Sequence, residues 1–186
     1  HLISGSEGTL VFVTEIKLKL TKKPKAKALF AISYDDFGTA LEDARDLLSY
    51  NPSAIETVDD NIVELAKNDE VYHKIKHMLE KDPSLNLKAV NFIEFIADSD
   101  NDLKIKTSKL EELLIDRSMV YHFTTQSYEM DSLWELRKKG VGLLGSMKGD
   151  RKPIPFIEDT AVSPEHLANY IKELSALLDS HGVKYG

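Results

Sequence analysis

Hydrophobic and polar residues alternate along an early segment of the chain, residues 10–20. Ile16, Leu18 and Leu20 point one way, and the charged residues between them point the other way. This period of two predicts a β-strand. A basic stretch broken by a proline, residues 21–25, follows the strand. We place a domain boundary there, which divides the chain into residues 1–24 and residues 25–186.

Two strand–helix–strand units are predicted after this boundary. In the first, strands at 27–34 and 54–58 flank a helix whose apolar residues recur at helical spacing between Phe37 and Leu48. In the second, strands at 88–97 and 119–125 flank a helix that includes Leu110. Such units predict an α+β fold of the ferredoxin-like kind, an antiparallel sheet with helices packed on one face.

Turn and capping residues predict further details of the second unit and the elements in the rest of the chain. The polar residues 98–102 predict a turn, and Ser108 and Glu111 have the spacing of a capping box. Further predicted elements are helices at 60–81 and 129–139, an irregular glycine-rich stretch at 140–149 and a strand at 153–161. A last helix begins at 163–165 and buries an apolar stripe between Leu167 and Leu178. The final residues predict one more strand.

Composition narrows the classes of function. With 186 residues and 42% hydrophobic content, the chain is long enough for one well-buried core. Charged residues make up 30%, and no uncharged stretch is long enough for a transmembrane helix. Acidic residues outnumber basic ones, for a net charge of -7, which argues against nucleic-acid binding. There is no cysteine, and no signal peptide is visible, so we expect a cytoplasmic location or a peripheral one at the inner membrane.

Several polar clusters could carry chemistry, but each has a simpler interpretation. His73 and His77 have the i,i+4 spacing that lets two imidazoles share a metal, yet Lys74 between them opposes a cation. The oxygen-rich residues 98–102 lack the glycine and the glutamate of a calcium loop. His122 lies in a predicted strand, where we expect a packed or hydrogen-bonded role. We therefore predict no metal site and no catalytic residue in this chain.

A glycine-bearing turn, Gly5-Ser6-Glu7-Gly8, precedes the first strand. Such a turn can bring backbone N–H groups close to an anion or a ring system. Together with its flanks, Ile3 to Glu15, it resembles the end of the flavin-binding domain in FAD-linked oxidases of the vanillyl-alcohol-oxidase type, with Val11 in place of the usual glycine. The resemblance implies that Gly5, Ser6, Glu7 and Gly8 contact FAD.

Two later segments resemble the C-terminal cap domain of the D-lactate and D-2-hydroxyglutarate dehydrogenases of this family. They are residues 133–137, with Trp134 and Arg137, and residues 156–164, where Ile157 stands in place of a lysine that several members carry. The resemblance implies a small D-2-hydroxy acid as substrate, oxidised by hydride transfer to FAD. It also implies that Arg137 binds the substrate carboxylate. Lys152 lies just before the predicted strand at 153–161, and we expect it to supply a second positive contact to the substrate.

The resemblance further implies that this chain is part of a larger flavoprotein. Residues 1–24 match the tail of the FAD-binding domain and its linker, and residues 25–186 match the cap domain without its C-terminal end. The family's metal and base histidines and its main FAD-binding loop are not in this chain, so we expect it to be inactive alone and to retain no FAD. The segment 10–20 would then fold back on the domain or form a homodimer. The alternative is a non-enzymatic ferredoxin-like binding or assembly module.

Overall fold

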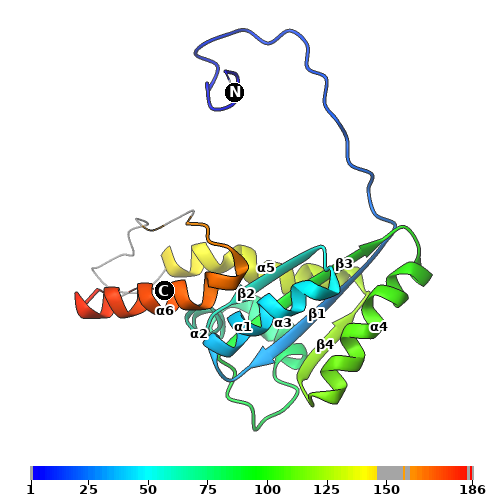
Figure 1. Ribbon diagram of the computed structural model, residues 1–186, viewed down its shortest axis with the longest axis vertical. Helices are drawn as coiled ribbons and strands as arrows, with labels where there is room; N and C mark the ends of the chain where they lie inside the picture. Colours follow the sequence, from blue (N-terminus) through cyan, green and yellow to red (C-terminus); the bar gives the residue numbers. More distant parts are fainter. Residues whose placement is uncertain (1, 146–156, 158–159, 184, 186) are drawn as a thin grey trace.

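Four antiparallel strands form one sheet at the centre of the molecule, in the order β2-β3-β1-β4 (Figure 1). The computed structural model describes residues 2–145, 157, 160–183 and 185. The strands are β1 (Ala26–Tyr34), β2 (Ala54–Val58), β3 (Ala89–Ala97) and β4 (Val120–Thr124). The helices are α1 (Phe37–Leu47), η1 (Leu48–Tyr50), α2 (Asp60–Ala66), α3 (Glu70–Leu79), α4 (Asp100–Asp116), α5 (Ser127–Gly145) and α6 (Pro164–Ser180). The predicted α+β class with an antiparallel sheet is confirmed, and the ferredoxin-like description stays a prediction.

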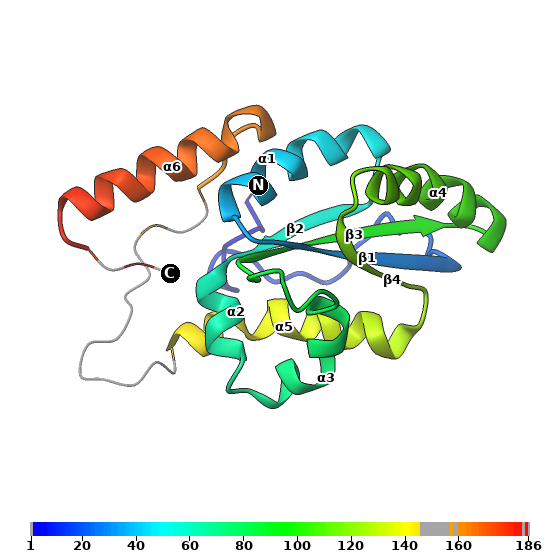
Figure 2. The same ribbon diagram turned by 90° about the horizontal axis from the view of Figure 1, so that it is seen from below.

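Helices cover both faces of the sheet, not one face as the sequence pattern suggested (Figure 2). The reason is that the two central strands are apolar on both sides. In β1, Leu29 packs toward α2, α3 and α5, whereas Phe30 packs toward α1 and α4, and both side chains are fully buried. A strand that is buried on both faces needs a layer of helices on each side.

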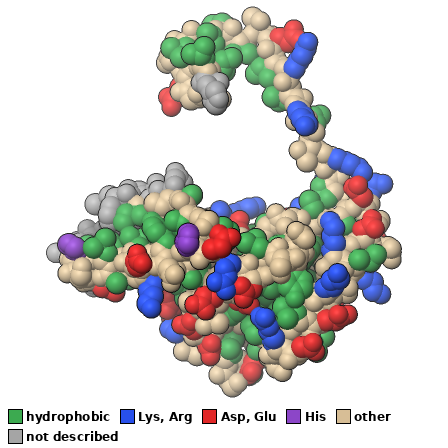
Figure 3. Space-filling view, in the orientation of Figure 1, with side chains coloured by type: hydrophobic (Ala, Val, Ile, Leu, Met, Phe, Trp, Pro, Cys, Tyr) green, Lys and Arg blue, Asp and Glu red, His purple; other side chains and the backbone are tan. Residues whose placement is uncertain are grey.

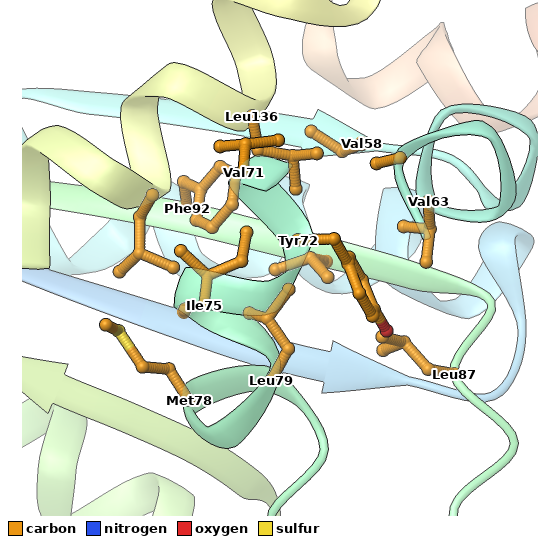
Figure 4. Packing of buried hydrophobic residues seen from close by; sticks show 14 of the residues in the cluster. Val58, Val63, Val71, Tyr72, Ile75, Met78, Leu79, Leu87, Phe92 and Leu136 are labelled. Carbon is orange, nitrogen blue, oxygen red and sulfur yellow. The ribbon is translucent and has the colours of Figure 1, made fainter. Parts of the chain in front are cut away.

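The layer formed by α2, α3 and α5 holds the larger of the two hydrophobic clusters (Figure 4). Phe92 of β3, Ile75 of α3 and Leu136 of α5 meet there with no exposed surface. Burial of such side chains contributes about 1.5–3 kcal/mol each. This cluster fixes α5 against the sheet, and α5 carries the predicted substrate residue Arg137.

Three helix boundaries differ from the sequence-based expectations. The predicted helix at 60–81 is two helices, because Asp69 accepts a hydrogen bond from the backbone N–H of Val71 and begins α3 there. α4 begins at Asp100, where the Ser99 hydroxyl caps its first turn, so the predicted capping box at Ser108 lies inside the helix. α5 continues through Gly140 and Gly142 to Gly145, in the described part of the stretch 140–149 that was predicted to be irregular. At Gly140, α5 faces Ile62 of α2, at a distance where an added Cβ atom would make ordinary van der Waals contact.

The last helix, α6, packs mainly against α1. The predicted burial of its apolar stripe is wrong, since α6 has no buried residue and the Leu177 side chain is 57% exposed. The predicted strand at 153–161 and the predicted final strand lie largely outside the described residues. Where these stretches are described, the structure shows no strand.

The segment 10–20 is extended but is not a strand, which corrects the sequence-based prediction (Figure 1). It stands clear of the domain, and its apolar side chains are exposed along its length (Figure 3). Phe12 is fully exposed, and Leu20 is 85% exposed. The alternating pattern identified a suitable chain segment, but a strand also needs a neighbour whose backbone completes its hydrogen bonds, and none of the described residues provides one.

Candidate functional site

The glycine-bearing turn near the N-terminus has an unusual backbone. Gly5, Glu7 and Gly8 have φ angles of 79°, 48° and 75°, in the left-handed region. The turn is closed by backbone hydrogen bonds from Ser6 N–H to the Ile3 carbonyl, 3.1 Å, and from Thr9 N–H to the Ser6 carbonyl, 2.9 Å. A Cβ atom added at either glycine would meet no other described atom within 4 Å. The turn is therefore preformed and open to an approaching group.

Arg137 lies on α5, and its side chain is 55% exposed. Its Nε–H donates a hydrogen bond to the Glu56 carboxylate on β2, and the Arg137 side chain has no other hydrogen-bond or ion-pair partner within the described residues. A guanidinium has five N–H donors. The two terminal amino groups are thus left for a ligand, in the fork arrangement that matches a carboxylate.

The position of Arg137 follows from the packing of one turn of α5. Trp134 and Arg137 are three residues apart and so share a helix face. Beneath them, Glu56 and Phe92 are paired across β2 and β3. The Trp134 ring packs on Phe92, with ring centroids 5.7 Å apart at an interplanar angle of 58°. The aromatic contact anchors this turn of the helix, so that Arg137 reaches Glu56.

The next turn of α5 is fixed by a second ion pair. Lys139 donates to the Asp69 carboxylate at 2.8 Å and lies 3.5 Å from Glu135. The hydrogen bond from Lys139 lowers the pKa of Asp69, and the same bond raises the pKa of Lys139. Lys139 is therefore occupied by acids of this domain, whereas the terminal nitrogens of Arg137 are not. Lys152, the other predicted substrate residue, lies outside the described residues.

The remaining candidate residues are either paired with a neighbour or exposed on a helix surface. His122 is hydrogen-bonded, as expected, with its Nε2 atom 2.9 Å from Glu129. His73 and His77 are exposed on α3, and the described part of the chain holds no group of three or more residues able to bind a metal. Asp98, in the acidic turn, forms an ion pair of 2.9 Å with Lys22 of the linker.

A groove of about 740 Å³ was not foreseen from the sequence. It lies where β1 begins, between α4 and the start of α5, and includes Lys25, Lys104 and Ser127 on its rim and Phe123 among its apolar walls. The only signal for it was the run of lysines in the linker. Neither Arg137 nor the glycine-bearing turn lines this groove, so it is separate from the predicted substrate and flavin contacts.

Comparison with known proteins gives one family and several relatives. The family described as FAD linked oxidases, C-terminal domain, matches residues 23–186. The D-2-hydroxyglutarate dehydrogenase of Escherichia coli (strain K12) is 38% identical over 193 residues, and that of Haemophilus influenzae is 39% identical over 196 residues. Each alignment covers all of this chain and 19% of the relative. The glycolate oxidase subunit GlcD of Bacillus subtilis is 23% identical over 195 residues, 98% of this chain and 37% of that protein.

The chain thus spans about a fifth of the length of the dehydrogenases that it matches. Among the helices of the described residues, none combines the length and the apolar character that crossing a membrane requires.

Proposed function

This chain belongs to the C-terminal domain family of FAD-linked oxidases, and we propose that it forms the substrate-side cap of an FAD-dependent dehydrogenase. The proposed reaction is the oxidation of a small D-2-hydroxy acid, of the D-lactate or D-2-hydroxyglutarate class, by hydride transfer to the flavin. The observation that carries the proposal is similarity over the full chain to four proteins named D-2-hydroxyglutarate dehydrogenase, at 37–39% identity. This similarity favours a redox role over the alternative of a binding or assembly module.

The proposed domain division assigns residues 1–24 to the tail of the FAD-binding domain and its linker. Residues 25–186 are assigned to the cap domain. The exposed apolar side of residues 10–20 supports this division, because such a segment is completed by pairing with a strand elsewhere. In isolation the same segment favours self-association, which is the basis for the proposed homodimer. The proposed location of the full-length protein is the cytoplasm.

The proposed FAD contact is made by the backbone of Gly5, Ser6, Glu7 and Gly8. The positive φ angles at Gly5 and Gly8 and the open space beside both fit the close approach of a flat ring system. When bound, FAD supplies the acceptor for the hydride. The turn is a single contact, and no glycine-rich loop for the FAD pyrophosphate follows or precedes it in this sequence. We therefore propose that this chain alone does not retain FAD.

The proposed role of Arg137 is to bind and orient the substrate carboxylate. Its free terminal amino groups can donate two parallel hydrogen bonds to a carboxylate, which holds the carbon next to the carboxylate in a fixed direction. Lys152 is proposed as a second positive contact, and Trp134 keeps the helix turn of Arg137 on the sheet. Positioning of the hydroxy acid is thus the contribution of this domain, and the redox chemistry belongs to the flavin.

Flavin retention tests the proposed division of labour. The isolated chain and the full-length protein are each mixed with excess FAD, desalted and examined by visible absorbance. We expect a colourless chain and a yellow full-length protein with one FAD per molecule. A stoichiometric yellow complex of the isolated chain would contradict the proposal that this chain alone does not retain FAD. A full-length protein without flavin would contradict the proposed function.

A further inference from the structure

The contact between Glu56 and Arg137 joins two parts of the chain that are 81 residues apart in sequence. It uses only the Nε edge of the guanidinium, as described above. The other edge, with both terminal amino groups, has no partner within the described residues. A carboxylate that holds the Nε edge fixes the rotation of the guanidinium plane and leaves the fork of the other edge free.

We propose that Glu56 is a positioning residue that orients Arg137 for the substrate carboxylate. This inference rests on the proposed function, because it takes Arg137 as the substrate contact. Glu56 itself does not contact the substrate. It acts by holding Arg137 in one orientation before the substrate arrives.

The surroundings of Glu56 make it suited to this role. Its side chain is 35% exposed and belongs to β2, whose backbone is hydrogen-bonded to β3 along its whole length. The neighbour across the strands, Phe92, is fully buried and packs against Trp134. Glu56 and Arg137 therefore both stand on rigid elements that are clamped together one helical turn from the contact. A residue on a rigid strand positions its partner more tightly than one on a loop.

Two effects of Glu56 oppose each other. The negative charge of Glu56 repels a substrate carboxylate bound at the opposite edge of the guanidinium, and this repulsion weakens substrate binding. The hydrogen bond to Glu56 restricts the rotation of the long arginine side chain before the substrate binds, so that less conformational entropy is lost on binding. Because the pair is partly exposed, the repulsion is screened by water and salt. We therefore expect the gain in orientation to outweigh the repulsion.

Substitutions in the full-length enzyme separate orientation from charge. Glu56→Ala removes both the hydrogen bond and the charge, and we expect the KM for the hydroxy acid to rise about tenfold with kcat changed by less than about twofold. Glu56→Gln keeps an oxygen that accepts the Nε hydrogen bond and removes only the charge, so its KM should stay close to that of the wild type. Glu135→Gln, an acid of the same helix that pairs with Lys139 instead, is the matched control and should leave KM unchanged.

A double substitution links the effect to Arg137. Arg137→Met should raise KM more than Glu56→Ala does, and in the Arg137→Met background Glu56→Ala should have no further effect. If Arg137→Met matters but Glu56→Ala leaves KM unchanged or lowers it, the positioning role of Glu56 is wrong and the proposed function stands. An equal effect of Glu56→Ala with and without Arg137 would also overturn the positioning role. If Arg137→Met itself leaves KM unchanged, the proposed substrate contact fails instead. Thermal unfolding of each variant identifies any loss of fold.

Discussion

Substitution of Asn91, a buried polar residue at the centre of the sheet, should cost more stability than its small size suggests. Asn91 lies in β3 with no exposed surface. Its Nδ2 atom donates to the Ala40 carbonyl of α1 at 2.8 Å, and its Oδ1 atom accepts from the Thr57 hydroxyl of β2 at 2.7 Å. One side chain thus joins three elements, and all its polar atoms are satisfied within the described residues.

Asn91→Ala removes both hydrogen bonds. Each bond contributes about 1 kcal/mol, and the carbonyl that loses its buried partner adds about 1 kcal/mol more. With the small void left behind, we expect the free energy of unfolding to fall by about 2–4 kcal/mol. For a chain of this length that corresponds to a decrease in Tm of roughly 5–15 °C. Thr57 is half-buried, so in Asn91→Ala its hydroxyl can bond to water instead. Thr57→Val leaves the buried Oδ1 atom of Asn91 without its donor and should cost about 1–3 kcal/mol.

Urea unfolding measures these differences, with far-UV circular dichroism and tryptophan fluorescence as the two probes. Trp134 is the single tryptophan and packs on Phe92, so its fluorescence reports the contact between α5 and the sheet. Asn61→Ala is the control, because Asn61 is exposed and its side chain bonds, among the residues that the structure describes, only to Asp59 at 3.3 Å. It should change stability by less than about 0.5 kcal/mol. A similarly small effect of Asn91→Ala would refute the reasoning.

Two further predictions concern local structure and pH. Ser99→Ala should destabilise the protein by about 1 kcal/mol through loss of the α4 cap, whereas Ser108→Ala, at the position that the sequence suggested as the cap, should have almost no effect in the same urea assay. The hydroxyl of Thr124 and then the ring of His122 lower the pKa of Glu129 from its usual 4.5. Ionised Glu129 therefore contributes stability above about pH 4.5, and this contribution is lost as the pH falls through the lower pKa of the folded state. Thermal unfolding between neutral and acidic pH should show the difference between the wild type and Glu129→Gln shrinking on acidification, and a constant difference would exclude this role.

Elements with a strong local pattern could be predicted from the sequence. β2 was placed at its observed bounds, and β1, β3 and α1 were found to within a residue or two. In α1 the apolar residues recur at helical spacing and are buried on one face, whereas β1 and β3 are continuous apolar runs that are buried on both faces. Residues 10–20 have an equally clear alternating pattern, but this pattern does not show which strand would pair with them. A periodicity identifies a surface able to pack and does not identify what packs on it.

In the candidate site, too, the sequence identified a residue that lies in a recognisable segment and missed its partner from a distant segment. Arg137 was identified through a resemblance in residues 133–137. Glu56 was not, because it is 81 positions away and only the register between β2 and β3 brings it beneath α5. The groove beside Lys104 was missed for a similar reason, since residues of the linker, α4, β4 and α5 contribute to it together. Such groups become neighbours only when the sheet order is known.

Reduction of bound flavin by substrate tests the central claim most directly. The full-length protein that contains this chain is held without oxygen, a D-2-hydroxy acid or its L enantiomer is added, and the visible absorbance of the oxidised flavin is followed. We predict that the D enantiomer bleaches the flavin and the L enantiomer does not, and that Arg137→Met shifts the bleaching to higher concentrations of the D enantiomer. A flavin that stays oxidised with every D-2-hydroxy acid tested, in a folded protein that holds FAD, would contradict the account.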